Sequence, residues 1–226
     1  MLIAMPNWPP FSPTEYATDM PDELLELLPL LHGSCIIVQS AVYDHALLAY
    51  MKSSSEFNLK IRESYLAAVI NQVEISLTKS LVLSLASLFD SAPATVNIRR
   101  ALNVAVRDQW LPILEPRHSL RSEDVSRKRD RLIRMQRRIK RAPLKGAIER
   151  VTDFRNKGVA HVDKDQGLDF KIPTYGDTTL TLAAAANIVV SLLSYLTFRR
   201  AGIRALHTQA NQQAELLGRA IQPLTS

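Results

Sequence analysis

The chain has 226 residues, a formal net charge of +6 at pH 7 and a single cysteine, Cys35. This length can bury a substantial core, but one cysteine excludes an intrachain disulfide and a zinc site built from cysteines. The apolar start of the chain stops at Pro6 and lacks the basic flank of a signal peptide. We therefore expect a protein of the reducing cytoplasm.

The first part of the chain predicts an arm followed by helices. Residues 1–20 are rich in proline and aromatic residues, which favours an extended arm. Helices are predicted over 22–31 and from Ser34, as an N-cap, to about Met51. The longest predicted helix covers 57–89, because apolar residues recur there at three- and four-residue steps. Its predicted buried stripe consists of Leu66, Val69, Ile70, Val73, Leu77, Leu81, Leu85 and Leu88.

The second part of the chain also predicts helices and gives no clear strand signal. We expect helices at about 96–108, 123–141, 144–161, 177–200 and 204–221. The prediction is an all-α helical bundle, formed by one domain over residues 21–222 behind the arm. Residues 178–198 are uncharged and long enough to span a membrane. Their Thr, Ser, Asn and Tyr content favours a buried core helix instead, so no membrane association is expected.

The excess positive charge is concentrated in residues 117–145, which contain 12 basic and 3 acidic residues. Part of this segment forms a predicted helical stripe, because its arginines follow one another at steps of three and four. A stripe of like charges is self-repelling unless an anion neutralises it. A phosphate backbone fits this surface, although a solvated face or an acidic protein partner remains open. The predicted RNA-binding residues are Arg127, Arg131, Arg134, Arg138 and Arg141.

Residues 155–163, with the sequence RNKGVAHVD, carry the main chemical signal. Metal-free RNA cleavage needs a base for the 2′-OH proton, a donor for the leaving 5′ oxygen, and positive charge on the phosphorane. Histidine exchanges protons near neutrality, and arginine offers phosphate a charged, planar fork. On a straight α-helix Arg155 and His161 would lie about 120° and 9 Å apart. Two chains meeting across a two-fold axis would supply both a base and an acid, so we expect a homodimer.

The same nine residues resemble the signature of the HEPN superfamily, in which an Arg is followed after four to six residues by His. The Ala160-His161-Val162-Asp163 ending is similar to the AbiU-like branch associated with abortive infection, and residues 87–90 fit that branch loosely. The resemblance implies a dimeric all-α bundle with a metal-independent endoribonuclease site and no cofactor. It implies Arg155 and His161 of both protomers as catalytic residues, with Asn156 assisting.

The resemblance also sets expectations about biology. It implies a role in phage defence or as the toxin of a toxin–antitoxin pair, with RNA as substrate and an antitoxin or sensor as a further partner. We expect Asp163 to support the site. Some toxin members carry a Tyr at that position as a modification site, so control by such modification is not expected here.

Other interpretations of these residues stay open. Arg200 and His207 also have the Arg-to-His spacing, but they lack the polar follower and the Ala-His-x-Asp ending. Arg155, Asn156 and His161 could serve structure alone, in a non-catalytic module that binds nucleic acid or a partner protein through the basic stripe. The histidines show no metal-ligand spacing, so no metal site is predicted.

Overall fold

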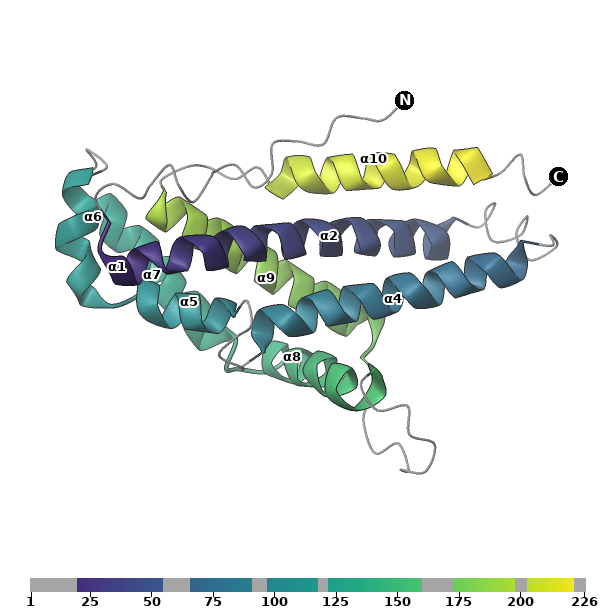
Figure 1. Cartoon of the computed structure of the whole chain (residues 1–226), viewed down its shortest axis with the longest axis horizontal. Coiled ribbons are helices and arrows are strands. Elements are labelled where there is room, and N and C mark those ends of the chain that lie inside the picture. The colour runs from purple at the N-terminus through teal and green to yellow at the C-terminus, as the bar shows by residue number, and fades with distance from the viewer. Residues whose placement is uncertain are drawn as a thin grey trace.

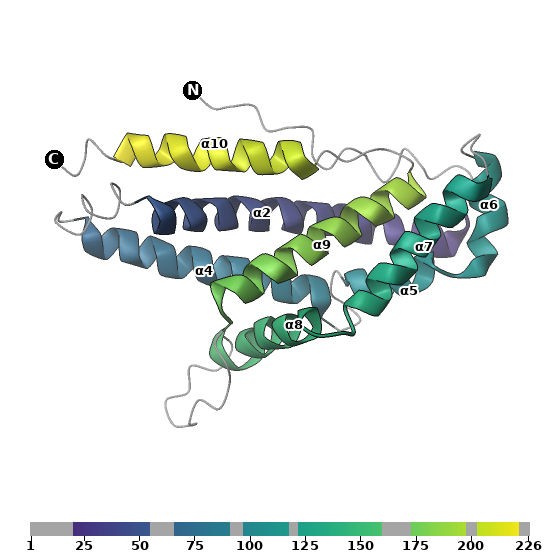
Figure 2. The same ribbon diagram turned by 180° about the vertical axis from the view of Figure 1, so that it is seen from behind.

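The computed structural model describes residues 20–54, 66–90, 97–117, 122–159, 173–197 and 203–221. Within these ranges the secondary structure is helices joined by short turns and no strand occurs, which confirms the all-α prediction. The predicted N-terminal arm lies outside the described residues, as do residues 57–65 of the predicted long helix. Figure 1 shows α10, α2 and α4 running side by side, and Figure 2 shows α9 crossing α4 and α2 on the other face.

The first helices differ from the prediction at Ser34. A short helix, α1 (Asp22–Leu25), is followed at once by α2 (Leu27–Ser53), which continues without a break through Gly33 and Ser34. Ser34 is not an N-cap: its side chain is buried and its Oγ donates to the carbonyl of Leu30 at 2.8 Å. This back-bond to the preceding turn satisfies the hydroxyl inside a helix. The buried apolar residues on either side of Ser34 favour one long helix over two short ones.

The helix α4 (Ala67–Phe89) is buried over only half of its length. Leu81, Leu85 and Leu88 lie in the core as predicted. Val69 and Val73, however, are 56% and 38% exposed, so the prediction of a nearly unbroken buried stripe is wrong in the N-terminal half. Periodicity identifies an apolar face, but it does not say whether a neighbouring helix covers that face along its full length.

The core is one cluster of apolar side chains drawn from most of the helices. The helix α9 (Tyr175–Leu196) contributes many of them, which confirms the prediction of a core helix in this region. By length and composition alone, three stretches could cross a membrane: Asp22–Ser53, Ala67–Phe89 and Tyr175–Leu196. In the fold these three stretches pack against one another, and α9 is the most fully buried of them.

A group of shorter elements gathers at one end of the long helices (Figure 1): α5 (Ile98–Ala105), η2 (Asp108–Trp110), α6 (Leu111–Arg117) and α7 (Ser122–Arg138). The Asn97 side chain caps α5 by accepting from the backbone N–H groups of Arg99 and Arg100. Two basic residues attach α7 to its neighbours. Lys128 Nζ donates to the carbonyl of Ser194 in α9, and Arg129 Nε donates to that of Val106, each at 2.8 Å.

The last helix, α10 (Ile203–Ile221), packs along α2. Gly218 faces the ring of Tyr50 so closely that a Cβ atom there would lie 2.1 Å from Tyr50 Cε1. Only glycine fits this position unless the Tyr50 ring moves, because real non-bonded contacts are much longer. This close approach places Gly218 of α10 directly against the Tyr50 side chain of α2.

Candidate active site

Arg155 and Asn156 lie where the helix α8 (Leu144–Asp153) changes its geometry. From Phe154 to Val159 the chain forms a π-helix, η3, and not the α-helix that we expected through the motif. Its i→i+5 turns are wider, so the separation estimated for a straight α-helix does not apply. Single π-helical turns inside α-helices are rare and frequently occur at functional sites. His161 and Asp163 lie outside the described residues.

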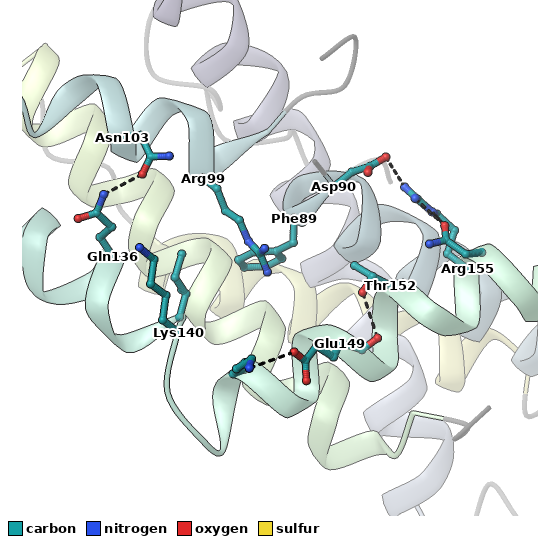
Figure 3. A pocket seen from close by; sticks show the side chains of 12 residues that line it. Phe89, Asp90, Arg99, Asn103, Gln136, Lys140, Glu149, Thr152 and Arg155 are labelled. Carbon is teal, nitrogen blue, oxygen red and sulfur yellow. Dashed lines mark hydrogen bonds and ion pairs between the residues drawn. The ribbon is translucent and has the colours of Figure 1, made fainter. Parts of the chain in front are cut away.

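The guanidinium of Arg155 is held by two oxygen acceptors (Figure 3). Nη1 donates to Oδ2 of Asp90 at 2.7 Å, while Nε and Nη2 donate to Oδ1 of Asn156 at 2.9 and 2.7 Å. The Arg155 and Asp90 side chains are only 24% and 15% exposed. A carboxylate this buried needs a partner of opposite charge. Asp90, the C-cap of α4, thereby orients the arginine.

Arg155 and Asn156 line a pocket of about 490 Å³, which is shown in Figure 3. Its walls come from the ends of α4 and α8, from α5, from α7 and from the turn after α7. Four cationic and two anionic side chains line it, so the wall carries an excess of positive charge. The lining residues are Phe89, Asp90, Arg99, Asn103, Gln136, Ile139, Lys140, Lys145, Glu149, Thr152, Arg155 and Asn156.

The predicted RNA-binding stripe lies elsewhere on the same basic segment. Arg127, Arg131, Arg134, Arg138 and Arg141 are all exposed, and none of them lines this pocket. On α7 the first four lie about 140–180° around the helix axis from Gln136, which does line the pocket. Arg141 follows the end of α7, because the helix stops at Arg138 and not at Arg141 as predicted. The stripe and the pocket are therefore separate basic surfaces.

Several pocket residues carried little or no recognisable signal in the sequence. The sequence indicates Asp90 only by the loose resemblance of residues 87–90 to the family. It gives no sign that Arg99, Asn103 and Gln136 belong to the pocket. They come from three helices that are distant along the chain, and only the tertiary fold brings them together. Lys140 and Lys145 belong to the basic segment, but Lys140 is out of phase with the arginine stripe and Lys145 lies on a different helix, α8.

An ion pair joins α8, which precedes the motif in the chain, to the start of α9, which follows it. Arg150 Nε donates to Oδ2 of Asp177 at 2.9 Å, and its Nη2 contacts Oδ1. Asp177 and Thr174 also form a reciprocal capping box at the start of α9. Hydrogen bonding to Arg150, supported by the bonds from Thr174, holds the pKa of Asp177 well below its usual range. These contacts fix the helix that leads into η3.

The structure describes only the histidine of the second Arg-to-His pair. Arg200 lies outside the described residues, and His207 lies in α10, away from the pocket. Burial lowers the pKa of His207 and also that of His45, whose Nε2 lies 2.9 Å from Thr179 Oγ1. His45 stacks on the Tyr175 ring, with centroids 4.9 Å apart. His45, on α2 beside α9, and His207, on α10, are therefore histidines packed between helices.

The pocket carboxylates both have cationic neighbours. Glu149 Oε1 lies 3.6 Å from Lys145 Nζ, and Asp90 pairs with Arg155. Within the described ranges no three His, Cys, Asp or Glu side chains gather as a metal site would require. The pocket thus brings together two arginines, two lysines and amide side chains, which suit binding of a phosphate group.

A comparison with known protein families identifies the family of the chain. The model of the AbiU2 family of HEPN domains (HEPN_AbiU2) matches residues 21–215, which is most of the chain. No curated protein and no solved structure matches the chain. The family match covers every described helix from α1 to α9 and most of α10. The chain belongs to the HEPN AbiU2 family, as its nine-residue motif indicates.

Proposed function

We propose that this protein is a metal-independent endoribonuclease of HEPN type that acts in abortive phage defence or as a toxin. One observation carries the proposal: in a chain of this family, the motif residues Arg155 and Asn156 line a polar pocket with an excess of positive charge. A charged arginine fork in a partly buried site is suited to stabilising negative charge on a phosphorane.

The proposed reaction uses the 2′-OH of RNA as the nucleophile. As the 2′ oxygen bonds to phosphorus, one His161 takes its proton, and the bond from phosphorus to the 5′ oxygen breaks. The second His161, from the other protomer of a homodimer, donates a proton to the leaving 5′ oxygen. Arg155 exchanges its contact with Asp90 for the phosphate oxygens, and Asn156 keeps the guanidinium oriented.

The remaining roles follow from charge and position. Asp163 would orient His161, and the exposed arginine stripe on and after α7 would attract the RNA backbone. We place the protein in the cytoplasm, without membrane attachment or cofactor, and propose an antitoxin or sensor protein that restrains its activity.

The proposal is tested by cleavage of labelled RNA by the purified protein in EDTA. We expect Arg155→Ala to lower the cleavage rate about 10²–10³-fold, and His161→Ala to lower it about 10²–10⁴-fold. Arg204→Ala is the matched control, because Arg204 is exposed on α10 and does not line the pocket. Each variant is compared at matched folding by its melting temperature. Unchanged cleavage by both motif variants, or cleavage that requires a metal ion, would contradict the proposal.

A non-catalytic function is the second candidate. It is favoured by the exposure of all five stripe arginines, and by the engagement of Arg155 with Asp90. In that case the protein would bind nucleic acid or an acidic protein partner through the stripe. RNA binding that weakens steeply with salt, without cleavage of any RNA, would favour this function.

A further inference from the structure

The pocket has two ends, and they differ in whether their cationic side chains pair with a carboxylate. At one end Arg155 pairs with Asp90 at 2.7 Å, and along the wall Lys145 lies 3.6 Å from Glu149. At the other end Arg99 and Lys140 have no carboxylate partner among the described residues. The uncompensated positive charge of the pocket is therefore carried by Arg99, on α5, and Lys140, in the turn after α7.

Arg99 is positioned by an aromatic ring. Its guanidinium carbon lies 5.9 Å from the centroid of the Phe89 ring, and Phe89 is almost fully buried. The Nε atom is buried without a hydrogen-bond partner in the part of the chain that the structure describes. Contact with the ring face stabilises the guanidinium, while an unsatisfied buried donor is unfavourable. The side chain is thus held by the ring, and no acceptor in the described segments engages its terminal nitrogens.

Two amide side chains lie beside these cations (Figure 3). Gln136 Nε2 donates to Asn103 Oδ1 at 2.7 Å, which fixes the two amides relative to each other. Gln136 Oε1 and Asn103 Nδ2 have no partner among the described residues, so they offer one acceptor and one donor. Phe89 and Ile139 supply the apolar part of the wall. Cations, a free donor and acceptor, and apolar surface together match a nucleotide better than they match an inorganic anion.

We propose that the Arg99–Lys140 end of the pocket is a subsite for a second phosphate of the RNA, next to the phosphate that Arg155 contacts. A volume of about 490 Å³ is too large for one phosphate group alone and is typical of pockets for nucleotide-sized ligands. In this arrangement Arg99 and Lys140 bind the second phosphate, while Gln136 and Asn103 contact its sugar or base. The inference rests on RNA being the substrate.

The test measures RNA binding separately from cleavage. Affinity for a short single-stranded RNA is measured in EDTA over a range of salt concentrations, with His161→Ala as the background so that the RNA stays intact. Arg99→Gln and Lys140→Ala should each weaken binding and lower the salt slope by about 0.7, the value for one lost single-strand phosphate contact. Arg99→Lys should retain the slope, because it keeps the charge.

Two control variants distinguish the subsite from general charge. Arg100→Gln removes the neighbouring arginine, which lies 3.7 Å from Glu26 and does not line this pocket. Lys79→Ala removes an exposed lysine of α4 outside the pocket. Both should leave the slope unchanged. A nucleoside monophosphate should compete with the RNA, whereas inorganic phosphate at the same ionic strength should compete much less.

The outcomes separate this inference from the proposed function. Equal affinity and slope in Arg99→Gln, Lys140→Ala and the parent protein would overturn the subsite, even if the native chain cleaves RNA. Equal loss in Arg100→Gln and Lys79→Ala would also overturn it, because the effect would then be general. Cleavage by the native chain in EDTA is scored independently, so its absence counts against the proposed nuclease and not against the subsite.

Discussion

The chain has two basic surfaces, and they are built in different ways. The stripe of five arginines comes from α7 and the turn that follows it, and all of its members face solvent. The four cations of the pocket wall come from α5, η3, the same turn and α8, and two of them have carboxylate neighbours. The first surface is a local repeat along the sequence, whereas the second exists only after folding. Charge density in a sequence therefore locates the first surface and does not reveal the second.

The basic segment itself is divided among three tasks by the fold. Its stripe arginines are exposed, Lys128 and Arg129 bond to backbone carbonyls of neighbouring segments, and Lys140 and Lys145 line the pocket. A partly buried basic side chain that donates to a carbonyl stabilises packing and is less available to a ligand. Only part of the positive charge of this segment is thus exposed to an anionic ligand.

The largest effect is expected from Asp177→Asn, which breaks the ion pair with Arg150 that supports the pocket. The change removes the charge that Arg150 contacts, and the carboxylate is 9% exposed, so we expect a loss of about 1–3 kcal/mol in unfolding free energy at pH 7. Cleavage should fall with it, while RNA binding by the stripe remains. Urea denaturation measures the loss, with the exposed Asp130→Asn as the control, which should change stability little.

The same variant has an expected pH dependence. Because Arg150 lowers the pKa of Asp177 in the folded state, the carboxylate stabilises the fold fully above its unfolded pKa of about 3.9. That stabilisation is lost as the pH falls from about 4 through the folded-state pKa. The difference between native protein and Asp177→Asn should therefore shrink below pH 4. A difference that stays constant between pH 7 and pH 3 would contradict this origin.

A smaller effect is expected from changing the outer surface alone. In the double variant Arg131→Gln and Arg134→Gln, the salt slope of single-stranded RNA binding should fall by about 0.7 per arginine. The cleavage rate at saturating RNA should not change, because neither residue lines the pocket. Arg204→Gln, which removes one positive charge from α10, serves as the control for the effect per arginine. A lower rate at saturating RNA would mean that the stripe takes part in the reaction after all.

The smallest effect is expected from pH changes near neutrality. Burial lowers the pKa of both His45 and His207 in the fold, and the charge of His207 lowers that of His45 further. Their protonation therefore favours the unfolded chain, and stability should decrease as the pH falls below about 6.5. Burial raises the pKa of Asp44, which acts in the opposite direction, so the quantity to measure is the difference made by His207→Gln.

Measuring His207→Gln also separates the pH dependence of stability from the pH dependence of cleavage at the pocket. Unfolding free energies of native protein and His207→Gln are compared at pH 7.5 and pH 5.5, and the variant should lose less stability on acidification. If the two proteins lose the same amount, His207 does not contribute to the pH dependence. A pH profile of cleavage that persists in His207→Gln can then be assigned to the active site.

Sequence patterns predicted the helices well where burial and periodicity agree. The core helix near residues 178–198 appears as α9, and the predicted helix over 204–221 appears as α10. The predicted helix start at Ser34 is wrong. A serine can serve as an N-cap, but it can also lie inside a helix when its hydroxyl bonds to the preceding turn, as Ser34 does. The prediction of a buried stripe over 66–88 is wrong in its first half, because the described helices leave Val69 and Val73 exposed.

The candidate site was predictable only at its local motif. Arg155 and Asn156 follow from residue types and spacing, and both line the pocket. Their π-helical backbone did not follow, because no residue in 154–159 marks the change of geometry in the sequence. Asp90 lies 65 positions from Arg155 along the chain. A contact over this separation depends on how α4 and α8 pack, which helix periodicity does not specify.

The contact between Gly218 and Tyr50 limits how α10 can move. A slide of α10 by one helical turn along α2 would replace Gly218 by another residue beside the Tyr50 ring. One turn earlier in α10 that residue is Ala214, which carries the methyl group that the contact excludes. Ratchet motions of one turn, which some proteins use for switching, are thus closed to this helix unless Tyr50 rotates away. In the described fold this contact favours the register in which Gly218 of α10 lies against Tyr50 of α2.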